Sequence, residues 1–260
     1  MRLADAIATP DGKRRYVRAL FSTIADRYDL ITVLLSYGQD QRWKRRLVEL
    51  AGSGDAVAPH RTGRASPERS RRALDLATGT GDIAFRLAAA GWDVVGLDVT
   101  RRMIELAREK SSARRRPGDR AAARFLVGDM LALPFPSMSF DVVTAGYGLR
   151  NVPDLPAAIE EIHRVLKNGG QALSLDFNRP ANPLVRRAYL AYLQITGGLL
   201  GWILHRDPDT YRYIPASIRN YPGAEGVARL LEARGFVGVE HRNVLGGLMT
   251  IHVARKPGGA

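Results

Sequence analysis

Acidic residues and glycines recur in the middle of the chain at the points where short apolar runs end. Such residues suit a ligand that carries a sugar and an amine. Carboxylates accept hydrogen bonds from hydroxyl and amino groups, and glycines let a ligand approach the backbone closely. In chain order the candidates are Asp75, Gly79, Thr80, Gly81, Asp98, Asp129, Met130, Gly146 and Tyr147.

The apolar runs alternate with stretches of helical periodicity. The pattern predicts strands over residues 73–77, 93–98, 124–127, 140–145 and 171–176, and helices over 82–90, 101–110 and 156–166. Strands that alternate with helices form a parallel sheet covered by helices on both faces. Ligands of such sheets lie beyond the carboxyl ends of the strands. The candidate residues fall at these ends, so we expect them to form one site.

Two cofactor classes fit the glycine turn, because residues 79–84 also match the dinucleotide pattern G-x-G-x-x-A. Asp75 argues against a pyrophosphate, which a nearby carboxylate would repel. It can hold the turn or, through water, an ammonium group. Asp98 lies where an acidic residue can bind both ribose hydroxyls, and Asp129 where one can accept from an adenine amine. These positions favour S-adenosylmethionine, with Met130 against the adenine ring.

The remainder of the chain adds segments outside this alternation. We expect N-terminal helices over residues 13–50, broken at 36–39, and a flexible basic loop over 52–72 that is rich in arginine. We expect one or two apolar helices over residues 183–204 and a further helix over 225–234. Two closing strands are expected over 237–242 and 249–254, including an antiparallel edge pair. The predicted fold class is α/β, a doubly wound and mostly parallel Rossmann-like sheet. It divides into a substrate-side segment 1–51, the loop 52–72 and a methyltransferase domain 73–260 with a helical lid over about 183–222.

Composition excludes several chemistries. The chain has no cysteine, which excludes disulfides and thiolate catalysis, and its five histidines lack metal-ligand spacing, so we predict no metal. The net charge of +13 favours anionic partners, either nucleic acid or an anionic membrane surface.

The N-terminus has no signal-peptide pattern and the most apolar stretch, residues 189–204, is too short and interrupted to span a bilayer. We therefore expect a cytoplasmic protein that rests on the inner face of the cell membrane.

Three sets of segments resemble the signatures of one family, the ubiquinone/menaquinone biosynthesis C-methyltransferases. The segment 21–29, continued by 35–38 and by Trp43 and Lys44, looks like its first signature, and 146–152 is similar to its second. Residues 209–214 and 217–219 resemble its third marker, whereas 164–170 is generic to many methyltransferases. The resemblance implies a class I fold and cofactor contacts from Thr80, Asp98, Asp129, Met130 and Gly146.

Three departures from the family pattern qualify this resemblance. Family members often carry Asn where this chain has Thr32, and a glycine where it has Thr78. The position of Gly146 is commonly serine, so a side-chain hydroxyl contact is lost there and only the backbone can serve.

The family's reaction methylates a ring carbon of a polyprenylated quinol. The resemblance leads us to expect demethylmenaquinol as the substrate, with the equivalent step of ubiquinone biosynthesis as the alternative. Such a carbon becomes nucleophilic when the neighbouring hydroxyl loses its proton. Arg150 can stabilise the developing phenolate, and Asn151 can position a water that carries the proton away. The alternative for this pair is structural, an ion-pair residue and a helix cap.

Aromatic residues are the candidates for substrate binding, since rings stack on a quinol and hydroxyls bond its oxygens. We select Tyr147, Tyr28 and Tyr211, with Tyr213 as a further candidate and core packing as the alternative. Segment 184–204 is expected to form a lid or channel wall for the isoprenoid tail. Arg186, Arg187 and the basic loop would attract anionic lipid headgroups.

Other functions are less favoured. A nucleic-acid methyltransferase commonly carries an Asn/Asp-Pro-Pro-Tyr/Phe tetrad after the fourth strand, where residues 145–148 read Ala-Gly-Tyr-Gly, so we expect no nucleic-acid partner. A non-catalytic subunit would not need the intact acidic strand ends. A homodimer is a further expectation.

Overall fold

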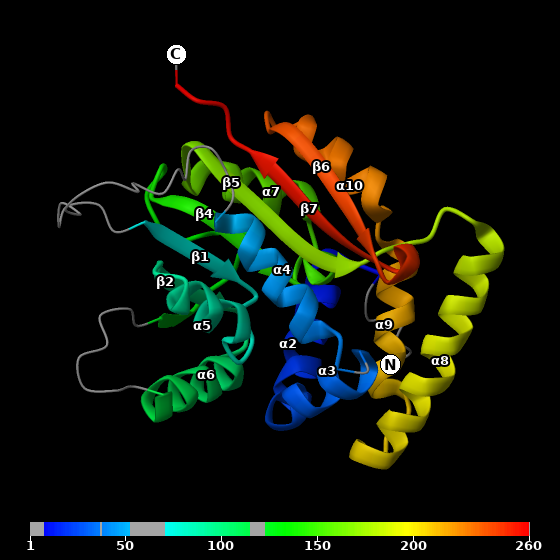
Figure 1. The fold of residues 1–260 in the computed structure, drawn as a ribbon. Helices are drawn as coiled ribbons and strands as arrows, with labels where there is room; N and C mark the ends of the chain where they lie inside the picture. Colours follow the sequence, from blue (N-terminus) through cyan, green and yellow to red (C-terminus); the bar gives the residue numbers. More distant parts are fainter. Residues whose placement is uncertain (1–7, 37, 53–70, 115–122, 260) are drawn as a thin grey trace.

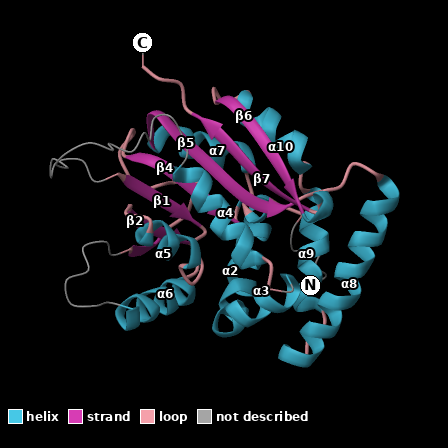
Figure 2. Ribbon diagram, viewed as in Figure 1, coloured by secondary structure: helices cyan, strands magenta, loops and turns pink. Residues whose placement is uncertain are grey.

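The fold is that of a computed structural model, which describes residues 8–36, 38–52, 71–114 and 123–259. Within these residues seven strands form one sheet in the order β3-β2-β1-β4-β5-β7-β6. Figures 1 and 2 show the sheet between two layers of helices. The strands are β1 (Arg72–Leu76), β2 (Asp93–Asp98), β3 (Arg124–Val127), β4 (Phe140–Gly146), β5 (Leu166–Phe177), β6 (Val237–Val244) and β7 (Met249–Arg255).

The first five strands pair in parallel, whereas β7 runs antiparallel to both β5 and β6. The predicted doubly wound sheet and its antiparallel closing pair are therefore confirmed. Strand order reverses between β1 and β4, which places the expected ligand site at the carboxyl ends of these two strands.

The helices follow the predicted alternation with small shifts of their ends. They are α2 (Pro10–Ile24), η1 (Ala25–Arg27), α3 (Tyr28–Ser36), α4 (Asp40–Gly52), α5 (Asp82–Ala89), α6 (Arg101–Arg114), η3 (Leu149–Asn151), α7 (Leu155–Val165), α8 (Pro183–His205), α9 (Asp209–Asn220), α10 (Gly223–Glu232) and η4 (Leu245–Gly247). Capping residues explain several starts. Asp154 accepts the backbone N–H of Ala157 at 3.0 Å, and Asn182 accepts that of Leu184 at 2.9 Å just before Pro183.

The core lies on both faces of the sheet. One apolar cluster joins β1, β2, β4 and β5 to α7 and α10, and the other joins the opposite face to α4, α5 and α6. The central strands are buried on both sides, which is why they read as continuous apolar runs. Among the described residues no helix is long and apolar enough to cross a membrane.

Two boundaries differ from the predicted ones. The fifth strand begins at Leu166, because the segment predicted as the end of a helix turns directly into β5. Both ends of the predicted loop 52–72 belong to regular elements, since Gly52 is the last residue of α4 and Arg72 the first of β1. Residues 53–70 lie outside the described ones. The domain division stays a prediction, but Leu47 of α4 packs into the same core as the sheet.

Candidate functional site

A first pocket lies beyond the carboxyl ends of β1 to β4 and encloses about 730 Å³, part of it open to solvent. The N-terminal helix α2 and Tyr28 form its other wall. Of the eight predicted cofactor residues it is lined by five: Gly79, Asp98, Asp129, Met130 and Gly146.

Asp98 is a fixed acceptor in this pocket. Its Oδ2 accepts the backbone N–H of Gly79 at 3.0 Å, and its Oδ1 accepts that of Thr100 at 2.8 Å. Burial raises the pKa of the carboxyl, and the two backbone donors partly offset this shift. A carboxylate held on two sides in this way presents its remaining lone pairs to the pocket in one orientation.

Asp129 and Met130 lie at the end of β3, as predicted. Asp129 Oδ1 accepts the N–H of Leu131 at 3.0 Å, and Oδ2 lies 3.5 Å from Nε of Arg14. Arg14 belongs to α2, so this helix contacts the sheet side of the pocket through an ion pair. Met130 is buried against the core.

The other three predicted cofactor residues do not line the pocket. Asp75 is buried below the turn, where it accepts the hydroxyls of Thr78 at 2.6 Å and Thr144 at 2.7 Å. Burial raises its pKa to about 6. Of the two roles considered for Asp75, this geometry favours holding the turn. Gly81 caps α5 with φ of 93°, and Thr80 donates to Asp29 at 2.6 Å.

Two non-glycine residues adopt left-handed backbone conformations at the switch point. Ala77 follows β1 with φ of 48°, and Tyr147 follows β4 with φ of 58°. Such conformations carry strain and concentrate at functional sites. A Cβ on Gly148 would lie 2.6 Å from Cβ of Ala77, so this position admits only glycine. The two loops therefore approach each other closely at the pocket floor.

A second, apolar pocket of about 1130 Å³, part of it open to solvent, adjoins the first. Both pockets share Phe21, Tyr28 and Tyr147, so these rings form the boundary between them. The three predicted substrate residues Tyr28, Tyr147 and Tyr211 all line the second pocket. Helices α2, α3, α8 and α9 supply most of the remaining wall.

The tyrosine hydroxyls in the second pocket have different environments. Tyr211 is hydrogen-bonded to Nε2 of His205 at 2.9 Å. The hydroxyl of Tyr213 is buried and has no hydrogen-bond partner among the described residues. Burial raises the pKa of Tyr213, so it is a neutral donor. A buried hydroxyl without a partner is costly, and this one keeps a proton that it can donate to a ligand oxygen.

Arg150 lines the second pocket and forms a buried ion pair with Asp176 at the end of β5. Its guanidinium also donates to Ser217 and lies 4.9 Å from the ring centre of Phe177. Asp176 was missed by the sequence analysis, although it is an acidic residue at a strand end, the signal used for Asp98.

Asn151 lies on the side of the first pocket, unlike Arg150. It lines the first pocket, its Nδ2 donates to the carbonyl of Tyr147 at 2.8 Å, and its Oδ1 has no partner among the described residues. The two predicted catalytic residues thus lie on opposite sides of the boundary, with Arg150 on the apolar side.

Lys13 was also missed. It donates to the carbonyls of Arg150 at 3.1 Å and Val152 at 2.6 Å, and burial lowers its pKa to about 8. It joins α2 to the loop that carries Arg150 and Asn151.

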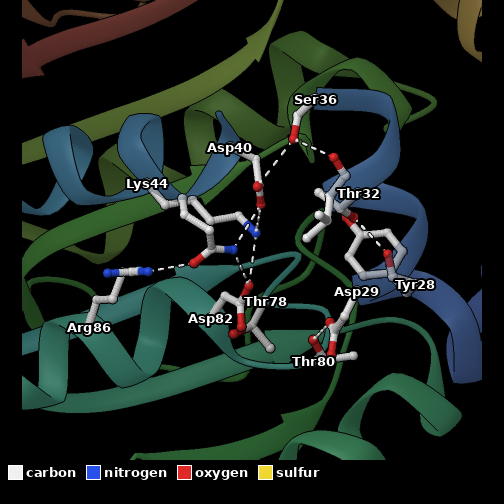
Figure 3. A network of polar contacts seen from close by, with 12 residues as sticks. Tyr28, Asp29, Thr32, Ser36, Asp40, Lys44, Thr78, Thr80, Asp82 and Arg86 are labelled. Carbon is white, nitrogen blue, oxygen red and sulfur yellow. Dashed lines mark hydrogen bonds and ion pairs between the residues drawn. The ribbon is translucent and has the colours of Figure 1, made fainter. Parts of the chain in front are cut away.

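Figure 3 shows a polar network that joins α3 and α4 to the glycine turn and α5. Nζ of Lys44 lies 2.9 Å from both Asp40 and Asp82, and Lys44 and Asp40 are buried. Asp29 of α3 accepts from Thr80 in the same region. These contacts hold the N-terminal helices over the cofactor side of the sheet. Within the described part of the chain, no group of three or more acidic or histidine side chains is arranged to hold a metal ion.

The fold and the acidic strand ends define the class of protein. The structure resembles that of a protein of Thermotoga maritima, described as an S-adenosylmethionine-dependent methyltransferase and possible histamine N-methyltransferase, with a TM-score of 0.61 and 16% identity over 92% of this chain and 99% of that one. This likeness confirms the fold of a class I S-adenosylmethionine-dependent methyltransferase.

The sequence comparisons narrow the class to a family. The model of the ubiE/COQ5 methyltransferase family matches residues 9–256, so the chain belongs to that family and uses S-adenosylmethionine. A demethylmenaquinone methyltransferase of Thermus thermophilus is 39% identical over 92% of this chain and 100% of its own length. A ubiquinone/menaquinone biosynthesis C-methyltransferase UbiE of Azotobacter vinelandii is 35% identical over 94% of this chain and 91% of its own length. The predicted family and cofactor are confirmed.

Proposed function

We propose that the protein transfers a methyl group from S-adenosylmethionine to a ring carbon of a polyprenylated quinol, converting demethylmenaquinol to menaquinol. The observation that carries this proposal is the meeting of two different pockets at Tyr147. One is lined by the acidic strand ends, and the other is apolar and large enough for a ring with part of its tail. The name of the Thermus relative supports the menaquinone step, whereas the name of the Azotobacter relative includes both quinones, so the choice of menaquinol is part of the proposal.

The first pocket fits the cofactor. In this proposal Asp98 accepts both ribose hydroxyls, Asp129 accepts from the adenine amine and Met130 packs on the ring. The orphan Oδ1 of Asn151 is an unused acceptor in the same pocket, and an ammonium group would satisfy it. Gly79 and Gly146 contribute backbone, while Asp75, Thr80 and Gly81 hold the turn.

The second pocket supplies the chemistry at the quinol. When bound, S-adenosylmethionine supplies an electrophilic methyl group on a positively charged sulfur. Arg150 stabilises negative charge on a quinol oxygen as the hydroxyl proton passes to a water molecule, which makes the adjacent ring carbon nucleophilic. After this carbon has taken the methyl group, loss of its own hydrogen as a proton restores the aromatic ring. The lining of the second pocket is mostly apolar, so this electrostatic stabilisation acts in a medium of low dielectric constant. Tyr147 and Tyr28 orient the ring at the boundary toward the first pocket.

Methyl transfer assays test the function directly. The purified protein should methylate a short-tailed demethylmenaquinol presented in detergent, and methylate the corresponding ubiquinone precursor more slowly. Faster methylation of the ubiquinone precursor would assign the alternative step. Methylation of RNA or DNA, or cofactor binding without methylation of either quinol, would contradict the proposal.

Arg150→Ala and Asn151→Ala test the assigned residues. We expect Arg150→Ala to lower turnover at saturating cofactor by about a hundredfold, with the dissociation constant of the cofactor unchanged. Asn151→Ala should instead weaken cofactor binding, because Asn151 lines the first pocket and its Nδ2 holds the carbonyl of Tyr147 at the boundary. Wild-type turnover and cofactor affinity in both variants would remove both roles.

A further inference from the structure

Helix α8 carries an exposed apolar face. Leu184, Ile195, Leu199 and Trp202 are 77%, 71%, 57% and 64% exposed, and the small residues Ala188 and Ala191 are exposed between them. Their spacing of three and four places them on one side of the helix, over about 27 Å of its length. Figure 1 shows α8 at the edge of the molecule, beside α9. A contiguous exposed apolar face of this size indicates a binding surface.

The charges around this face have one sign along the helix. Residues 177–206 contain no aspartate or glutamate, and residues 188–204 contain no charged side chain at all. Arg186 and Arg187 lie in the first two turns of α8, and Arg206 caps its last turn. The nearest acidic residues, Asp207 and Asp209, are engaged within the chain, with Thr210 and Arg212 respectively. Arginines at both ends of an apolar helix match a surface of anionic headgroups over acyl chains.

The same helix forms part of the apolar pocket. Tyr189 and Leu193 line that pocket from the buried side of α8, and Tyr192 lines it while being partly exposed. The opposite wall includes Ile31 and Leu35 of α3, a helix that also exposes apolar side chains: Leu30, Val33 and Leu34. Two helices with exposed apolar residues therefore border one apolar pocket.

We infer that the outer face of α8 docks on an anionic lipid bilayer, with the apolar pocket opening toward the acyl chains. The helix lies parallel to the surface, its apolar face at the boundary between headgroups and acyl chains and its terminal arginines against lipid phosphates. The delivery of a lipid-tailed substrate through this surface rests on the proposed function, whereas the docking itself does not.

Trp202 provides a direct probe of this docking. Of the three tryptophans in the chain, Trp92 is buried and Trp43 is partly buried in the apolar pocket, so Trp202 is the exposed one. Vesicles of phosphatidylcholine and phosphatidylglycerol in equal parts should shift the fluorescence to shorter wavelength and sediment with the protein. Vesicles of phosphatidylcholine alone should bind at least about tenfold more weakly, and high salt should weaken the binding to anionic vesicles. Trp202→Phe should lose the shift and keep the sedimentation.

Leu199→Glu is the test variant and Met138→Glu its control. The two side chains are 57% and 56% exposed, but Met138 lies in the loop before β4. We expect Leu199→Glu to bind anionic vesicles at least about tenfold more weakly, because it places a charge in the apolar boundary, and Met138→Glu to bind like the wild type. Equal binding to both vesicle types, or wild-type binding by Leu199→Glu, overturns the inference. So does a wild-type dimer that Leu199→Glu converts to monomer, since a second copy would then cover the face. The assay contains neither cofactor nor quinol, so methyl transfer to a short-tailed quinol in detergent tests the proposed function separately.

Discussion

The carboxylate of Asp176 binds both the side chain and the backbone of Arg150. Its Oδ1 accepts from the guanidinium Nε at 3.1 Å, and its Oδ2 accepts from the backbone N–H of Arg150 at 3.1 Å. Both side chains are almost fully buried. The carboxylate therefore fixes the loop after β4 as well as the charge that this loop carries into the apolar pocket.

Asp176→Asn should destabilise the protein by about 3 kcal/mol, because it leaves a buried guanidinium without a counter-charge. Urea unfolding measures this loss. Asp141→Asn is the control, since its pair with Lys167 is more exposed and should cost less than about 1 kcal/mol. The unpaired guanidinium should also stabilise a phenolate more strongly, so the acid limb of the pH–rate profile should move to lower pH. An unmoved profile would limit Asp176 to a structural role.

Tyr213→Phe should leave stability unchanged or raise it, because it removes a buried hydroxyl without a partner. Turnover of the quinol should nevertheless fall by about tenfold, the loss of one hydrogen bond to a substrate oxygen. Tyr221→Phe is the matched control: its hydroxyl is also buried and without a partner in the described structure, but Tyr221 lines neither pocket. Thermal unfolding and steady-state kinetics decide, and equal turnover in the two variants would contradict a substrate contact by Tyr213.

The sequence predicted the sheet and the strand ends because both depend on local patterns. Buried parallel strands are apolar runs, and ligand-binding residues follow them, as Asp98 and Asp129 do. The sequence could not decide between the two roles of Asp75, holding the turn or contacting the cofactor. Its distance from the glycine turn suits a cofactor contact, but its carboxylate is turned toward Thr144 of the neighbouring strand. The sequence also could not predict that Arg150 and Asn151 line different pockets. Adjacent residues on a 3-10 turn point in directions that only tertiary packing fixes.

Asp98→Asn should weaken cofactor binding at least about tenfold. Both oxygens of Asp98 accept hydrogen bonds from backbone N–H groups. The amide nitrogen of an asparagine would therefore face one of these donors, and the negative charge would be lost. Asp93→Asn, at the other end of the same strand, is the control because its partner Arg124 is exposed. Isothermal titration with S-adenosylmethionine, well below the unfolding temperature of each variant, gives the two dissociation constants. Equal values would exclude Asp98 from the cofactor site.

Asp75→Asn should change the pH dependence of stability. Burial raises the pKa of Asp75 from 3.8 to about 6, so its stabilising contribution is fully present below pH 3.8 and is lost as pH rises through 6. The shift corresponds to about 3 kcal/mol. The variant lacks this titration, so its stability relative to the wild type should improve by up to that amount between about pH 4 and pH 7. Urea unfolding at both pH values measures the difference, and a constant difference would show that Asp75 titrates normally.

Lys44→Met should destabilise the protein by about 3–5 kcal/mol, because it leaves the carboxylates of Asp40 and Asp82 without their shared cation, and that of Asp40 fully buried. Arg46→Met is a control on the same helix, since its pair with Glu49 is exposed and should cost less than about 1 kcal/mol. Combining Lys44→Met with Asp40→Asn should recover part of the loss, as it removes the buried charge. Equal costs for Lys44→Met and Arg46→Met would mean that the network in Figure 3 does not hold α4 against the glycine turn.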